Sequence, residues 1–245
     1  MDFIKNLALL VSATVMLTGC TATLSYRAKA VAGPPKPVGY PIFVYTEEMK
    51  VPRPCQVIGT IEAGYGNFMT FGESPEKVMK AVMKKAEQKG ADAVRVTSMI
   101  MPDFMNPNYR VNADLLRYAD SWESIAISEE EFRAYLKQNA RTLDPIEGVW
   151  SEQGPNECRI GIMKDSSKPG RDFVAFILGT KFAPWQNGYK KIDIARGSRR
   201  GAYLFDYCLD DFARQETTVI LGEAGVFQLD LQTLAGGELV IYLKN

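Results

Sequence analysis

Short apolar runs separated by turn residues fill the chain from residue 146 onward, and they constrain its fold more than any other feature. No helix-like pattern of useful length interrupts them. The runs are Gly148–Glu152, Cys158–Lys164, Asp172–Leu178, Tyr189–Ala195, Ala202–Tyr207, Thr217–Leu221, Val226–Leu231 and Glu238–Leu243. Strands at such close spacing are typical of a barrel or a sandwich. We therefore predict that residues 145–245 form an all-β, eight-stranded, barrel-like domain.

The preceding region, residues 41–127, predicts a small α+β domain with the order ββαββ. Ser74 is placed to cap a helix, Pro75 suits its first turn, and Gly90 supplies its stop. The expected strands are Pro41–Thr46, Gln56–Ala63, a run beginning at Ala91, and Leu115–Ile127. Residues 128–144 predict a helical connector, because Ser128 and Glu131 form a capping box and Asp144-Pro145 marks a boundary.

The first 20 residues have the layout of a secretory signal. Their apolar run of about ten residues is too short to cross a bilayer, which needs about 20. The sequence Leu17-Thr18-Gly19-Cys20 resembles the bacterial lipobox. This resemblance implies that residues 1–19 are removed and that Cys20 is acylated. In the family that this motif resembles, an Asp after the cysteine tends to retain the protein at the inner membrane, so the resemblance, with Thr21 here, implies the outer membrane, facing the periplasm. The alternative is an ordinary cleaved signal, with Cys20 inside the mature chain.

Residues 20–40 predict a lipidated tether, because Pro34, Pro35 and Pro37 block regular structure. A fully stretched tether of this length reaches at most about 65–70 Å.

Composition excludes several classes of function. The formal net charge is zero, which argues against a nucleic-acid partner. The chain contains no histidine, so Ser-His-Asp catalysis, Cys-His catalysis and His-containing zinc sites are impossible. Neither a phosphate loop nor a dinucleotide turn is present. We predict no enzymatic activity, no cofactor and no metal.

Acylation of Cys20 would leave three thiols, at Cys55, Cys158 and Cys208. An oxidising compartment permits one disulfide among them. Cys158 and Cys208, on two strands of the barrel-like domain, are the candidate pair. The alternative is that both thiols stay free.

Two resemblances bear on the domains. Arg53-Pro54-Cys55-Gln56-Val57-Ile58-Gly59, followed by Gly90-Ala91-Asp92-Ala93-Val94, resembles a superfamily that includes the lipoprotein sensor of the Rcs envelope-stress relay and dodecin-like domains. This likeness covers residues 41–127 and implies a compact α+β fold in the cell envelope. Gly148-Val149-Trp150 is similar to the Gly-x-Trp motif of lipocalins, which implies a barrel able to bind a small apolar ligand.

Two surface features are candidate contact sites. An apolar rim is expected on two loops at one edge of the first sheet, formed by Phe68, Met69, Phe71, Phe104 and Met105. Its alternative role is a lid over the core. A cationic hairpin carries Lys190, Lys191, Arg196, Arg199 and Arg200 and is a candidate contact for anionic glycans or lipid headgroups. Its alternative is a solvated turn.

Together these features predict an outer-membrane-anchored periplasmic lipoprotein with a non-catalytic interaction or structural role. Its expected partners are the membrane, through Cys20, and an envelope protein, lipid or glycan. The alternative function is a lipocalin-like lipoprotein that binds a lipid or a small apolar ligand.

Overall fold

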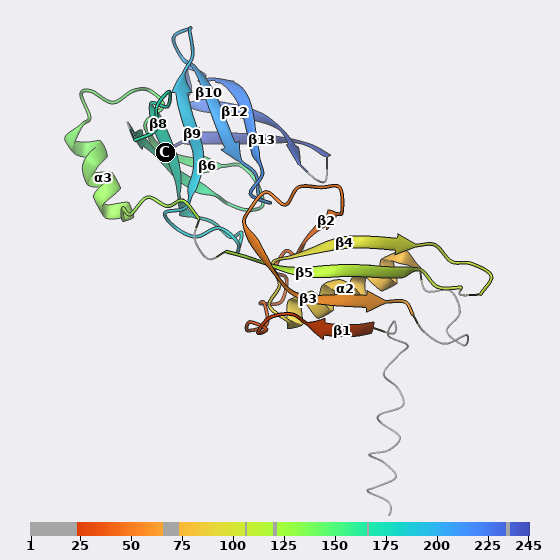
Figure 1. Ribbon diagram of the computed structural model, residues 1–245. Helices are drawn as coiled ribbons and strands as arrows, with labels where there is room; N and C mark the ends of the chain where they lie inside the picture. Colours follow the sequence, from red (N-terminus) through yellow and green to blue (C-terminus); the bar gives the residue numbers. More distant parts are fainter. Residues whose placement is uncertain (1–23, 66–73, 106, 120–121, 166, 234–235) are drawn as a thin grey trace, which may run out of the picture. The chain divides into compact units, whose positions relative to one another are not determined.

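The computed structural model describes residues 24–65, 74–105, 107–119, 122–165, 167–233 and 236–245 (Figure 1). The chain divides into two compact units. Among the described residues, the first contains residues 24–51 together with Cys55–Tyr118, and the second contains Pro52–Pro54 and the residues after Tyr118. Each unit has its own β-sheet, so each is described by itself.

The first unit is a five-stranded sheet with one helix on a face (Figure 1). Its strands are β1 (Leu24–Ala28), β2 (Phe43–Thr46), β3 (Cys55–Ala63), β4 (Ala93–Ile100) and β5 (Arg110–Tyr118), in the spatial order β1-β3-β5-β4-β2. Helix α2 (Pro75–Gln88) begins at Ser74, whose side chain accepts a hydrogen bond from the amide of Lys77. Val78, Val82 and Ala86 of α2 are fully buried against the sheet.

The tether predicted over residues 20–40 is wrong for Leu24–Ala28, which form β1 and pair antiparallel with β3. Leu24 and Tyr26 alternate onto the core face, and the Tyr26 ring lies over Gly59, where a Cβ atom would come within 2.4 Å of it. Residues after β1 are also docked, because Lys36 pairs with Asp92 at 2.5 Å. Proline spacing signalled an irregular backbone, but it carried no information on what that backbone packs against.

The strand expected over Leu115–Ile127 is instead β5, which ends at Tyr118. Strands β3 and β4 both run antiparallel to β5, so they are parallel to each other with β5 between them. Ala63 and Met99 both lie opposite Val111. The ends of β3 and β4 therefore share one edge of the sheet.

The second unit is a nearly closed, eight-stranded antiparallel sheet, in agreement with the barrel-like fold predicted for this part of the chain. Its strands are β6 (Gly148–Glu152), β7 (Arg159–Lys164), β8 (Phe173–Gly179), β9 (Lys190–Arg196), β10 (Ala202–Cys208), β11 (Arg214–Ile220), β12 (Val226–Thr233) and β13 (Gly236–Lys244), in the order β11-β10-β9-β8-β7-β6-β13-β12. The side chain of Gln215 on β11 bonds to the backbone of Asp230 and Gln232 on β12, which ties the two end strands together.

Aromatic rings fill the interior of this barrel-like sheet. Phe227 on β12 lies with its ring centroid 4.7 Å from Trp150, 5.4 Å from Phe205 and 4.9 Å from Tyr242. These rings come from β6, β10, β12 and β13, and all four are fully buried. The Trp150 ring nitrogen donates to the Ile146 carbonyl at 2.8 Å, so its polar atom is satisfied.

Helix α3 (Glu129–Gln138) packs on the outside of the barrel-like sheet and belongs to the second unit. It has the predicted capping box of Ser128 and Glu131. Its single fully buried residue, Phe132, lies over Gly161 and meets the Phe176 ring edge-on at 5.1 Å. In the described part of the chain, neither α2 nor α3 has the length and apolar character needed to cross a bilayer.

Candidate anion-binding site

The turn between β9 and β10 forms one wall of a surface cavity of about 290 Å³. The two strands pair with Tyr203 opposite Arg196, and the turn closes through a hydrogen bond from the Gly197 amide to the Ala202 carbonyl at 2.8 Å. Gly201 has φ +78°, a conformation that side chains with a Cβ rarely adopt. The cavity is lined by Asp144, Pro145 and residues 196–203.

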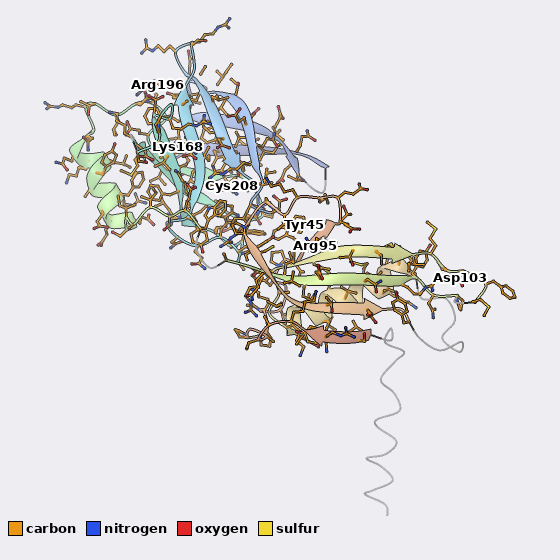
Figure 2. All side chains as sticks on the ribbon, viewed as in Figure 1. Tyr45, Arg95, Asp103, Lys168, Arg196 and Cys208 are labelled. Carbon is orange, nitrogen blue, oxygen red and sulfur yellow. The ribbon has the colours of Figure 1, made fainter. Side chains whose placement is uncertain are left out.

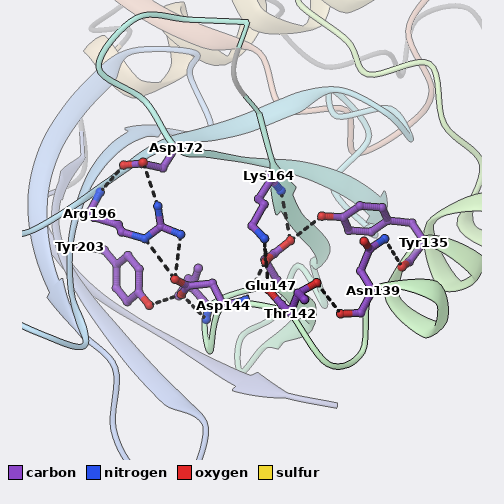
Figure 3. Close-up of polar contacts among 10 residues, drawn as sticks. Tyr135, Asn139, Thr142, Asp144, Glu147, Lys164, Asp172, Arg196 and Tyr203 are labelled. Atoms are coloured by element: carbon purple, nitrogen blue, oxygen red, sulfur yellow. Dashed lines mark hydrogen bonds and ion pairs between the residues drawn. The ribbon is translucent and has the colours of Figure 1, made fainter.

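Arg196 is held in place by two carboxylates (Figure 3). Its guanidinium donates two hydrogen bonds to one oxygen of Asp144, at 3.1 and 3.0 Å. It also donates to Asp172 at 3.0 Å, and the Arg196 amide reaches the same carboxylate at 2.8 Å. Its position is therefore set before any ligand arrives, while its positive charge is largely compensated.

On this side of the cavity, the Asp144 carboxylate accepts hydrogen bonds from both Arg196 and Tyr203. Burial acts to raise the pKa of Asp144, but hydrogen bonds from Tyr203, from the Ile146 amide and from Arg196 outweigh it and lower the pKa. Burial, together with the hydrogen bond to Asp144, raises the pKa of Tyr203 well above its ordinary range. At neutral pH the pair is therefore an ionised carboxylate and a neutral hydroxyl that donates to it.

Glu147, three residues after Asp144, fixes the same segment from the other side (Figure 3). It accepts hydrogen bonds from the Tyr135 hydroxyl at 2.6 Å and from the Asp144 amide at 2.7 Å. The wall of the cavity is thus connected to α3 and to the sheet by satisfied polar contacts.

Arg199 and Arg200 are the uncompensated charges of the site. Both are exposed, and within the described ranges neither guanidinium has a hydrogen-bond or ion-pair partner. Figure 2 shows long side chains extending from the turn beyond Arg196. Since Asp144 and Asp172 offset Arg196, the two free guanidiniums leave the cavity mouth net positive.

The structure separates the five cations that the sequence placed on one hairpin. Arg196, Arg199 and Arg200 line the cavity, whereas Lys190 and Lys191 lie at the other end of β9 and are buried. Arg196 follows Lys191 by five positions along the strand, or about 17 Å at 3.3 Å per residue. The prediction of one cationic patch is therefore wrong for the two lysines.

A β-bulge explains the burial of Lys191. Ile192 pairs with Ala175 and Lys190 pairs with Phe176, so Lys191 has no direct partner on β8. A bulge of this kind re-aims a side chain. The Lys191 ammonium lies over the rings of Trp185 and Tyr207, 4.1 and 4.8 Å from their centroids, and pairs with Asp210 at 3.1 Å.

Lys191 remains charged in this setting. Burial acts to lower the pKa of Lys191, but the neighbouring Tyr207 and Asp210 outweigh it, so the pKa is raised. Burial also raises the pKa of Glu152, whose carboxyl group lies near Lys191. The Lys190 ammonium has a different partner from Lys191, the buried carboxylate of Asp193, at 2.8 Å.

The cysteines of the described residues are free thiols. Cys158 and Cys208, the candidate disulfide pair, are both buried close to Lys191, and burial raises the pKa of each to about 12. Cys55 is exposed at the start of β3. Cys20 lies outside the described residues.

The apolar rim is described only in part. Phe68, Met69 and Phe71 lie outside the described residues. Phe104 and Met105 are 97% and 75% exposed, so neither covers the core as a lid.

Sequence reasoning missed the carboxylates that organise the cavity. Asp144 was interpreted only as a domain boundary, and Asp172 and Tyr203 only as parts of strands. The one local signal was that Asp144-Pro145 lies close to the start of a strand. Nothing in the sequence joined it to Arg196, which is 52 residues further along the chain.

No protein-family model matches the chain, and comparisons with curated proteins and with solved structures give no match either. Among the described residues, there is no group of three or more Cys, Asp or Glu placed to hold a metal ion.

Thiol labelling checks the state of the cysteines. In the Cys20→Ser chain at pH 8, a disulfide-exchange reagent should label the exposed Cys55 and leave Cys158 and Cys208 unreacted, because a thiol of pKa about 12 is roughly one part in 10⁴ thiolate at that pH. In denaturant without reductant, three thiols should titrate. A count of one, rising to three with reductant, would show a Cys158–Cys208 disulfide instead.

The Lys191–Asp210 pair should respond unequally to removal of each partner. Asp210→Asn leaves a buried ammonium without its carboxylate, and we expect it to lower the free energy of unfolding by about 1–3 kcal/mol. Lys191→Met should change it by less than about 1 kcal/mol, because the Asp210 side chain is 41% exposed and can be hydrated. Urea denaturation followed by tryptophan fluorescence measures both, and a larger loss for Lys191→Met would contradict the account.

Proposed function

We propose that this chain is an outer-membrane-anchored periplasmic lipoprotein with a non-catalytic role, and that its barrel-like unit binds an anionic group of another envelope component. The lipobox-like Leu17-Thr18-Gly19-Cys20 supports the anchor. The absence of histidine and the high pKa of the two buried thiols support a binding role rather than catalysis.

One observation carries the binding proposal. Among the residues that the structure describes, the exposed guanidiniums of Arg199 and Arg200 have no partner, and they line a cavity whose third arginine, Arg196, is already fixed. The geometry favours a ligand that adds negative charge to this mouth.

The ligand class follows from the chemistry of arginine. Its planar, forked donors match phosphate and carboxylate oxygens, which they bind in pairs. A phosphorylated or uronic-acid-bearing glycan, or a lipid headgroup, supplies such groups. A cavity of about 290 Å³ admits one headgroup or sugar unit rather than a whole acyl chain.

The alternative function, a small apolar ligand inside the barrel-like sheet, is poorly accommodated. Such a ligand would have to displace the contacting rings of Trp150, Phe205, Phe227 and Tyr242. Removing buried aromatic contacts costs several kcal/mol, at about 3–5 kcal/mol for one ring.

The anchor is tested by its processing. Cys20→Ala should accumulate as the uncleaved precursor, and globomycin should have the same effect on the unmodified chain. Mass spectrometry of the membrane fraction measures both. Normal cleavage of Cys20→Ala would contradict the anchor without bearing on the cavity.

The cavity is tested by reversing its charge. Arg199→Glu combined with Arg200→Glu should weaken binding of pyrophosphate or trigalacturonate at least tenfold in calorimetry at low salt, since each lost charged hydrogen bond is worth about 1.5–3 kcal/mol. The matched control is Lys137→Glu with Arg141→Glu, which makes the same change in net charge at exposed residues outside the cavity lining. An equal loss in both double variants would show that only net charge matters, and would overturn the site.

A further inference from the structure

Exposed apolar side chains gather at one edge of the five-stranded sheet, the edge at which β3 and β4 end and β1 and β5 begin. Thirteen large apolar residues are exposed among the described residues, and six of them lie at this edge. The six are Tyr65, Met99, Ile100, Met101, Phe104 and Met105. The other seven are scattered along both units, so this concentration distinguishes one small part of the surface.

The loop between β4 and β5 forms the tip of this edge. Met101 is 74% exposed and Phe104 is 97% exposed. In Figure 1 this loop projects beyond the ends of the strands, and Figure 2 labels Asp103 on it. The tip therefore offers large apolar groups that nothing within the described part of the first unit covers.

The charge of the tip is compensated. Its acid, Asp103, pairs with Arg110 at 2.5 Å and accepts a hydrogen bond from the Met105 amide at 2.9 Å. The carboxylate thus shapes the loop instead of presenting free charge to an apolar environment.

A band of polar contacts lies directly behind the tip. The Tyr65 hydroxyl donates to the Asn112 side chain at 3.1 Å, and the Asn112 amide donates to Ser98 at 2.8 Å. These bonds join the ends of β3, β5 and β4. The edge is therefore apolar at its tip and polar directly behind the tip. A membrane interface has the same order, with apolar acyl chains followed by polar headgroups.

Strand register brings the N-terminal segment to this same edge. Leu24 pairs with Ala63, Ala63 pairs with Val111, and Val111 pairs with Met99. The start of β1 and the end of β4 therefore lie along one row of the sheet. The described chain therefore begins, at Leu24, at the same edge of the sheet as the apolar tip, with β3 and β5 between β1 and β4.

The distance along the chain is short. Leu24 follows Cys20 by four residues, which span at most about 13–14 Å. This is far less than the 65–70 Å expected of a 20-residue tether, because β1 takes up residues 24–28.

We propose that this edge, with Met101, Phe104 and Met105 at its tip, inserts into the headgroup and acyl boundary of the phospholipid bilayer that holds the Cys20 lipid. The inference rests on the proposed anchor. Apolar surface groups enter such a boundary by about 5–10 Å, which suits side chains at a loop tip. The lipid and the tip then make two contacts, which together fix the orientation of the first unit on the membrane.

A tryptophan placed at the tip tests the inference. Phe104→Trp in the acylated full chain, reconstituted in vesicles of phosphatidylethanolamine and phosphatidylglycerol, should show blue-shifted emission and lose more than half of its added intensity with brominated acyl chains. The three native tryptophans all lie in the second unit, and the unmodified chain supplies their background.

Val38→Trp is the matched control. Val38 is 97% exposed, like Phe104, and lies between Lys36 and Tyr40, both of which bond to Asp92 just before β4 begins. The length of β4, about 23 Å at 3.3 Å per residue, separates the two positions. The tryptophan introduced by Val38→Trp should remain water-exposed and unquenched.

The outcomes separate the two proposals. Intact acylation by mass spectrometry with no quenching of the tryptophan in Phe104→Trp overturns the inference and leaves the anchor standing. If that tryptophan becomes shielded only when another envelope protein is added, the inference is also overturned, in favour of a protein partner. A chain without lipid on Cys20 overturns the anchor and the inference together. Unchanged melting of both variants confirms that neither substitution disturbs the fold.

Discussion

The pairing of β1 with β3 is the contact on which the proposed membrane geometry depends. It converts the segment after Cys20 from a long spacer into part of a sheet, and it fixes where that segment enters the first unit. Because β3, β5 and β4 pair in antiparallel register, the start of β1 lies at the same edge of the sheet as the end of β4 and the tip that contains Phe104. A shift of one residue in β1 would turn Leu24 and Tyr26 away from the core.

The second unit has an interior filled by aromatic side chains and a candidate site on its surface. Contacting aromatic rings occupy the interior, and a β-bulge turns Lys191 inward, where Asp210 and two rings accept its charge. At the other end of β9, Asp144 and Asp172 hold Arg196 beside two free guanidiniums. Strand β9 thus carries two buried, paired lysines at one end and an exposed arginine at the other. Its sequence alone does not distinguish these environments.

Local patterns predicted much of the fold. The helix caps at Ser74 and Ser128, and the eight close-spaced strands, depend on interactions within a few residues and were recognisable for that reason. The misplaced strand at Leu115–Ile127 and the missed strand β1 depend on partners far along the chain. The candidate site divides similarly: Arg196, Arg199 and Arg200 were predicted, whereas Asp144, Asp172 and Tyr203 were not.

By itself, the sequence determined the histidine-free chemistry, the neutral charge, the lipobox resemblance and the β-rich character of the C-terminal half. Those properties follow from composition and from short-range pattern. Only the tertiary structure decided that Lys190 and Lys191 are buried, that Arg196 meets Asp144, and that Leu24 and Met99 share one edge of a sheet. The burial of Lys191 depends on a bulge, the shared edge depends on strand register, and the Arg196–Asp144 pair depends on contact between distant segments; none of these is set by neighbouring residues.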